Sequence, residues 1–183
     1  MKSLIVCASA LVLGLGIAAA QPGRGGGAPA SPPATATAAI DGKTLTIKYS
    51  APSVRGRQIF GPGGLVSKDS TYPAWRAGAN NATAFHTDAD LELGGLSVPK
   101  GDYTLFVNVK DPNNWDLIVN KQTGQWGLTY DQAQDLGRVK MKMSKPGALV
   151  ELLKWSINQT GPKAGTLELQ WENHIATVPF TVK

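Results

Sequence analysis

The sequence has a single cysteine among its 183 residues, and that residue, Cys7, lies in an apolar N-terminal segment. The rest of the chain therefore has no thiol, which excludes disulfides, thiolate metal sites and cysteine nucleophiles. Histidine is nearly as scarce, since His86 and His174 are the only two. Neither histidine lies near a Gly-x-Ser-x-Gly turn, so the sequence does not indicate a catalytic triad of that kind.

Charge is also sparse. Charged residues make up 17% of the chain, and the formal net charge is only +5. A nucleic-acid-binding protein normally concentrates many more Lys and Arg side chains on one face, so we expect no nucleic-acid partner. After residue 20 no apolar run is long enough to cross a bilayer, and we expect no membrane span in the mature form. An anionic polymer outside the cytoplasm is a more suitable partner for this mild positive charge than a nucleic acid.

The N-terminal segment has the features of an export signal. One lysine precedes an apolar run over residues 4–20, and this run ends in three alanines. Such a charged start, apolar centre and small-residue end are typical of a secretory signal peptide, and the run is short for a membrane anchor. We therefore predict a signal peptide over residues 1–20 and a secreted or periplasmic protein.

A linker is expected after the signal peptide. Residues 21–34 are almost entirely Gly, Pro, Ala and Ser. This composition cannot bury enough apolar surface to offset the entropy of ordering the chain, so we predict that the segment is disordered. Residues 35–183 remain, and a chain of that size can bury a core as one domain.

The domain alternates apolar and polar residues with a period of two. Strict alternation of this kind indicates half-buried antiparallel strands. Residues 149–157 could form a helix, but their Gly- and Pro-containing flanks favour a strand; a helical turn is expected only near 130–135. We predict about eight to ten strands in a single antiparallel β-sandwich or barrel-like domain. The clearest alternating segments are 43–49, 102–109, 115–119, 139–143, 165–171 and 178–182.

The tryptophans divide into two groups. Trp115, Trp155 and Trp171 lie at apolar positions of alternating segments, so we expect them in the core. Trp126 lies in the segment Gly-Gln-Trp-Gly and is the tryptophan that we expect to be exposed.

Several segments together resemble a bacterial secreted family known as domain of unknown function 2911. The likeness covers nearly the whole globular part, and the spaced combination is more specific than any one segment. The resemblance implies an envelope or secreted location and an all-β domain, but it implies no substrate. The segments that carry it are YSAPSVRGRQIFG (49–61), YPAWRAGANNAT (72–83), LSVPKGDYTLFV (96–107), WDLIVNKQTGQWGLTYD (115–131) and LGRVKM (136–141).

Two Gly-containing irregular segments supply the candidate ligand site, which consists of Arg55, Arg57, Trp75, Arg76 and Asn80. Guanidinium groups bind carboxylates and phosphates as rigid forks, and a tryptophan face can stack on a sugar. If the fold brings the segments together, they would form a site for a small anionic or carbohydrate ligand. Alternatively, the arginines brace the loops through backbone carbonyls and local carboxylates.

The acidic segment from Phe85 to Leu93 is predicted to be one strand, with His86, Asp88, Asp90 and Glu92 on its wet face. Positions on the same face of a strand are roughly 6.5–7 Å apart, which is too far for side chains of one strand to share an ion easily, so we predict no metal site. The segment resembles in part the acidic strand of β-sandwich glucanases, where paired carboxylates cleave glycosidic bonds. An envelope glycan hydrolase acting through residues 86–92 is therefore one alternative function.

A basic stripe lies on another segment. Arg138, Lys140 and Lys142 share one face of a predicted strand. They could contact an anionic polymer, but lysines on an edge strand also prevent sheets from pairing edge to edge, and we favour that role.

The sequence thus favours a non-enzymatic secreted binding module that uses the arginine segments and needs no cofactor. The hydrolase and a purely structural envelope domain are the alternatives. No catalytic residue and no oligomeric state follow from the sequence.

Overall fold

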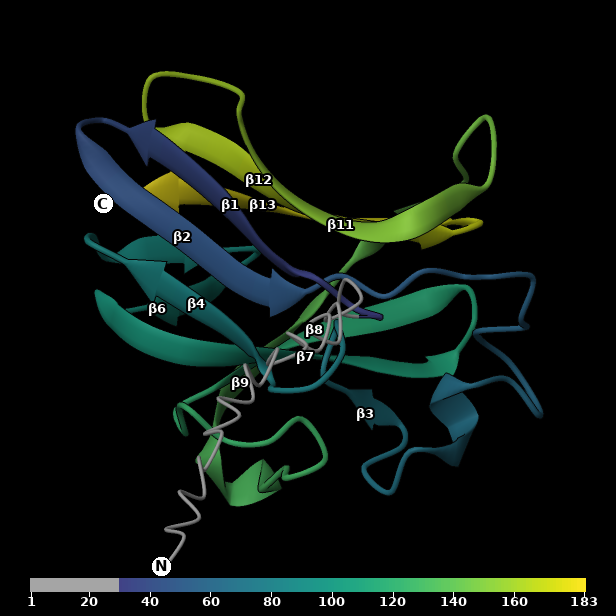
Figure 1. Cartoon of the computed structure of the whole chain (residues 1–183). Coiled ribbons are helices and arrows are strands. Elements are labelled where there is room, and N and C mark those ends of the chain that lie inside the picture. The colour runs from purple at the N-terminus through teal and green to yellow at the C-terminus, as the bar shows by residue number, and fades with distance from the viewer. Residues whose placement is uncertain (1–29) are drawn as a thin grey trace, which may run out of the picture.

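The computed structural model describes residues 30–183; the predicted signal peptide and most of the predicted linker lie outside this range. The described residues form two antiparallel sheets packed face to face, which confirms the predicted sandwich and not the barrel-like alternative. In Figure 1, β11, β12 and β13 lie in the upper layer, and β7 and β8 lie in the lower one.

The first sheet has the strand order β1-β2-β4-β7-β8-β9, and β3 pairs with β7 beside this path. β1 begins at Pro33, so the last two residues of the predicted linker belong to the sheet. The strands are β1 (Pro33–Ile40), β2 (Lys43–Ser50), β3 (Ala74–Trp75), β4 (Thr83–Thr87), β7 (Gly101–Asp111), β8 (Asn114–Asn120) and β9 (Asp135–Lys140).

The second sheet has the order β11-β12-β13-β5-β6, and β10 pairs with β13. Its longest strands are the C-terminal ones, because β11 to β13 form a meander in which each strand pairs with the next. The strands are β5 (Leu91–Leu93), β6 (Leu96–Val98), β10 (Lys142–Ser144), β11 (Val150–Gln159), β12 (Ala164–Glu172) and β13 (His174–Val182).

Residues 149–157 lie almost entirely in strand β11, as predicted. A single 3-10 turn, η2 (Gln132–Gln134), occupies the region where a helical turn was expected, and another, η1 (Val66–Lys68), precedes β3. The described part of the chain has thirteen strands, more than predicted, because several are only two or three residues long. Within residues 30–183 no helix is long and apolar enough to cross a membrane.

Two predicted strands are each divided between the sheets. The acidic segment bends after Thr87, so β4 belongs to the first sheet and β5 to the second. The Thr87 hydroxyl donates to the Ala89 carbonyl at 2.7 Å and replaces a strand-ladder bond at the bend. The segment 139–143 divides at Met141, so Lys140 ends β9 in the first sheet and Lys142 begins β10 in the second. Both single-strand predictions were therefore wrong.

Tryptophans dominate the core. Trp75 stacks on Trp171 with ring centroids 5.6 Å apart, and Phe60 meets both rings edge-on. Trp115, Trp155 and Trp171 are each at most 2% exposed, which confirms their predicted place in the core. Rings of this size bury enough apolar surface to stabilise a sandwich that has no cross-link among its described residues.

The edge of the first sheet carries basic side chains. β9 is the last strand of its sheet, and Lys140 there forms an ion pair of 2.7 Å with Asp116. Arg138 pairs with Asp135 at 3.0 Å. Lys142 lies on β10 of the second sheet, so the three basic residues do not form the stripe on one strand that was predicted, and only Arg138 and Lys140 lie on this edge.

Candidate functional site

The two arginines of the first irregular segment bind nearby backbone. Arg57 donates from Nε to the Val54 carbonyl at 3.0 Å and from Nη2 to the Ser53 carbonyl at 2.6 Å. The Arg55 backbone N–H donates to Glu151 Oε1 at 2.8 Å and so connects the loop to β11. The Arg55 guanidinium Nη2 donates to the Ala30 carbonyl at 3.3 Å. The side-chain contacts of the two arginines are of the bracing kind that the sequence left open as an alternative to a ligand site.

The second segment is packed more deeply. Trp75 is 2% exposed, so neither of its ring faces is open to a sugar. Arg76 Nη1 lies 3.5 Å from Asp69 Oδ2, and the Arg76 side chain lies against Gly127. Asn80 is exposed and has a positive φ of 59°, and its amide contacts the Ser50 hydroxyl at 3.4 Å.

None of the five predicted residues lines the hollows described below. Arg57 braces its own loop and Trp75 fills the core. Asn80 lies beside one hollow, because its partner Ser50 forms part of the wall.

The acidic residues are divided by the bend that follows β4. Asp90 accepts a bond of 2.7 Å from the Lys100 backbone N–H, and Glu92 forms an ion pair of 2.6 Å with Lys183. Both therefore lie with the second sheet, away from the His86 side chain on the first. The four residues do not form one catalytic or metal-binding face.

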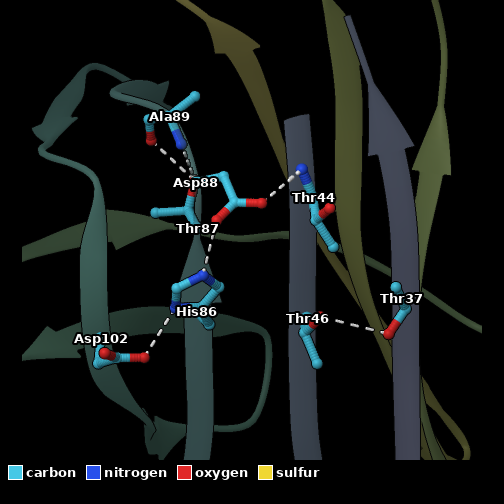
Figure 2. Close-up of polar contacts among 8 residues, drawn as sticks. All are labelled: Thr37, Thr44, Thr46, His86, Thr87, Asp88, Ala89 and Asp102. Carbon is cyan, nitrogen blue, oxygen red and sulfur yellow. Dashed lines mark hydrogen bonds and ion pairs between the residues drawn. The ribbon is translucent and has the colours of Figure 1, made fainter. Parts of the chain in front are cut away.

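His86 and Asp88 instead form a cluster with Asp102 of β7 (Figure 2). His86 Nδ1 lies 2.8 Å from Asp102 Oδ1, and His86 Nε2 lies 3.0 Å from Asp88 Oδ1. Asp88 also accepts a bond of 3.2 Å from the Thr44 backbone N–H, which ties β2 to the cluster. Asp102 was not anticipated from sequence, because it comes from a strand that is sixteen residues further along the chain.

The cluster shifts the pKa of its members. Hydrogen bonds to Asp88 and Asp102 raise the pKa of His86, and the hydrogen bond from His86 lowers the pKa of Asp88. The two carboxylates therefore favour the protonated form of the His86 ring that lies between them.

Cross-strand pairing sets the pattern of side chains on this outer face. One row runs from Thr46 to His86 and Asp102. The next row runs from Lys48 to Ala84, where the side chain shortens to a single methyl group. The face is therefore lower over Ala84 than over its neighbours.

A loop forms a wall beside this low region. Residues 121–127 follow β8 and fold back over the sheet, where Gln125 Oε1 accepts from the buried Thr104 hydroxyl at 3.3 Å. The Ala82 N–H donates to the Gln125 carbonyl at 3.2 Å, and Asn81 forms an isolated bridge with Trp126. Trp126 is 51% exposed, as predicted.

Two hollows adjoin between the loop and β2, with volumes of about 250 Å³ and about 240 Å³, and both are lined by Lys48 and Ala84. We refer to them together as the trough. Within residues 30–183 Lys48 forms no ion pair. The trough is lined by Thr46, Lys48, Tyr49, Ser50, Asn81, Ala82, Ala84, Phe85, His86, Asp102, Tyr103, Thr123 and Gly124.

Sequence reasoning missed Lys48, Ala84 and Asn81. The alternation of β2 and β4 does place Lys48 and Ala84 on outer faces, but their pairing depends on a register that the sequence does not reveal. The loop wall likewise depends on contacts between residues far apart in sequence, such as the bridge between Asn81 and Trp126.

Comparison with known families places most of this domain in one of them. The family model described as "Protein of unknown function (DUF2911)" matches residues 31–180. Comparison with curated proteins and with solved structures found no match.

Proposed function

Since the chain belongs to the DUF2911 family, whose description assigns no function, we propose from the geometry of the trough that it is a non-enzymatic module that binds an anionic, sugar-like chain outside the cytoplasm. The export signal and the linker predicted from the sequence motivate the location. The trough, rather than the loop arginines, is the site that we assign to the ligand.

The observation that carries the proposal is a lysine without an ion-pair partner in residues 30–183 that lines both hollows of the trough. Lys48 lines both hollows, so a ligand that fills either one meets its ammonium group. Hydroxyl and amide groups of Thr46, Ser50, Asn81 and Thr123 surround it. A cation combined with several neutral donors and acceptors is suited to an acidic sugar, which presents a carboxylate among hydroxyl groups.

The form of the trough favours a chain over a compact molecule. Its two hollows adjoin along β2 from Thr46 to Ser50, and each is open and close to 250 Å³. Neither is large enough to enclose a drug-sized ligand, because enclosing pockets occupy about 300–1,000 Å³. An extended oligosaccharide could occupy both hollows at once.

Two features of the His86 cluster count against hydrolysis. Glycosidases need two carboxyl groups with room for the glycosidic bond or a water between them, whereas the His86 ring stands between Asp88 and Asp102. The general acid must also have a raised pKa, and that of Asp88 is lowered.

Calorimetric titration tests the proposal with trigalacturonic acid as the acidic probe and maltotriose as the neutral one. We expect trigalacturonic acid to bind with a Kd of about 0.1–1 mM, a modest affinity typical of shallow sites. Lys48→Ala should weaken this binding about fivefold to tenfold, which is the loss of one exposed charge-assisted contact of about 1–1.4 kcal/mol.

Lys43→Ala is the matched control, because it removes the same charge from the same strand and Lys43 does not line the trough. Equal weakening by both variants would show that only net charge matters and would refute the trough. If Arg76→Ala weakens the binding of trigalacturonic acid while Lys48→Ala does not, and if the urea midpoint of Arg76→Ala is unchanged, the ligand binds at the loop arginines and not in the trough. Absence of binding by both probes would favour the purely structural role.

A further inference from the structure

A second hollow, at one end of the sandwich, is separate from the trough. It has a volume of about 300 Å³ and lies where the β7–β8 turn of the first sheet approaches the β12–β13 turn of the second. Pro112 and Asn113 line it from the first sheet, and Asn173 and His174 from the second. The end of β10 forms the remaining side. Its volume is at the lower limit of typical small-molecule sites.

The aromatic core closes the inner end of this hollow. The His174 ring stacks on Trp115 with centroids 5.0 Å apart and an interplanar angle of 18°, and Phe60 meets it edge-on at 4.9 Å. Trp115 is 1% exposed, so His174 is the ring of this cluster that the hollow reaches. Its position is set by packing, not by a flexible loop.

A carboxylate orients the His174 ring. His174 Nδ1 is buried and lies 3.2 Å from Glu172 Oε2, although its alignment is too poor for a full hydrogen bond. Glu172 Oε1 accepts from the Ile59 backbone N–H at 3.3 Å, which holds the carboxylate in place. The carboxylate favours a proton on Nδ1, because a lone pair there would face negative charge. Nε2 then carries the lone pair, and it has no hydrogen-bond partner among the described residues.

Burial and the neighbouring charges set the direction in which the pKa of His174 is shifted. Burial and the nearby Lys145 lower its pKa while Glu172 opposes them, and the net direction is downward from 6.5. The ring is therefore neutral at pH 7, and Nε2 accepts hydrogen bonds. Across the hollow, Asp111 binds within its own turn, because its Oδ1 accepts from the Asn113 N–H at 2.8 Å.

Lys145 adds a cationic hydrogen-bond donor beside the acceptor of His174. Ser144 pairs with Ile175 in the β10–β13 ladder, so the next residue, Lys145, lies beside His174. Lys145 lines the hollow and forms no ion pair within residues 30–183. Met143 and Pro112 add apolar wall between these polar groups.

We propose that this end hollow binds a small hydroxy acid, whose carboxylate pairs with Lys145, whose hydroxyl donates to His174 Nε2, and whose apolar skeleton lies against Met143 and Pro112. Lys145 offers a cation and His174 Nε2 offers a hydrogen-bond acceptor in the same hollow. A ligand that carries a carboxylate and a hydroxyl group would satisfy both at once. The site is independent of the trough, and it needs no covalent step.

Three probes separate the two contacts: 4-hydroxybenzoate has both groups, benzoate lacks the hydroxyl donor, and phenol lacks the carboxylate. Titration followed by the His174 and Trp115 ring signals in NMR spectra should give a Kd near 1 mM for 4-hydroxybenzoate. Benzoate and phenol should each bind about tenfold more weakly, since each leaves one polar group unpaired.

Matched variants assign each contact to its residue. Lys145→Gln should reduce the affinity for 4-hydroxybenzoate about tenfold and leave phenol unaffected. His174→Phe keeps a stacking ring and should abolish the advantage of 4-hydroxybenzoate over benzoate. Lys142→Gln, which changes the same charge on β10 outside the hollow, should change nothing.

The proposal is overturned if the three probes bind equally, if no probe shifts the His174 signals, or if Lys142→Gln acts like Lys145→Gln. Lys48→Ala serves as a further control. It should leave 4-hydroxybenzoate binding intact, so that failure of the trough and failure of the end hollow are distinguished.

Discussion

Gly127→Ala should destabilise the domain, because residue 127 has no room for a methyl group. A Cβ at this position would overlap the Arg76 side chain and the Asn80 carbonyl oxygen. The backbone oxygen cannot rotate away, since it accepts the Gly127 N–H at 3.0 Å. Arg76 is also restrained, because its guanidinium group lies beside Asp69 and its side chain is only 16% exposed. Overpacking of this kind costs about 1–3 kcal/mol.

Urea unfolding followed by tryptophan fluorescence measures the effect. With a denaturant slope of about 2 kcal/mol/M, a loss of about 2 kcal/mol lowers the urea midpoint by about 1 M. Gly147→Ala is the control, because a Cβ there would meet open space, and reduced unfolded-state entropy should make it neutral or slightly stabilising. An unchanged midpoint for Gly127→Ala would refute the tight packing of the loop against Arg76.

Two further predictions concern pH and the arginine. His86 has a raised pKa, so the stability that its two ion pairs provide is complete below about pH 6.5 and is lost as the pH rises through the folded-state pKa. Asp88 has a lowered pKa, so its contribution is complete above its ordinary value of 3.8 and is lost as the pH falls further. The wild-type protein should therefore lose stability relative to His86→Asn on passing from pH 5.5 to alkaline pH, by less than about 1 kcal/mol because the ring is exposed; parallel urea midpoints for both proteins would contradict this. Arg76→Lys should lower the urea midpoint as well as the affinity for trigalacturonic acid, because a lysine cannot place a guanidinium group beside Asp69 at the base of the loop wall, whereas a loss of affinity alone would place Arg76 in direct contact with the ligand.

The fold could be predicted from sequence where one physical signal dominates. Period-two alternation identifies β2 and β12 because every second side chain of each strand lies against the core. The same signal identifies β7 and β8, although both faces of these two strands are largely buried, with Phe106 and Ile118 in a second apolar cluster. The strand of residues 150–159 also followed from its flanking turn residues. Local pattern and tertiary packing agree in these elements.

The pattern failed where a strand passes from one sheet to the other. Residues 83–93 alternate without interruption, since a segment that crosses between sheets can still place every second side chain inside. Alternation reports which side of the chain is buried, and it does not report which sheet supplies the hydrogen bonds. The predicted wet face of four side chains was therefore divided between two sheets.

The candidate site was harder to predict for a different reason. Arginines and a tryptophan near glycines indicate a ligand site only if their side chains are not used in contacts within the protein. Trp75 stacks on Trp171 in the core, and Arg76 forms an ion pair with Asp69. Freedom from partners is a property of the folded chain. Lys48 looks like an ordinary exposed lysine in sequence, and it becomes notable only because Ala84 and the loop 121–127 form a trough around it.

The arginine segment and the trough are nevertheless parts of one structure. Arg76 packs on Gly127, whose N–H donates to Asn80, and the same loop presents Thr123 and Gly124 to the trough. An arginine that fixes a wall contributes to binding without touching the ligand. Residues 72–83, one of the segments that carry the family resemblance, would then act by holding the loop in place, and Lys48 on β2 would contact the ligand. Stability and affinity should consequently change together for substitutions in the wall and separately for substitutions in the floor.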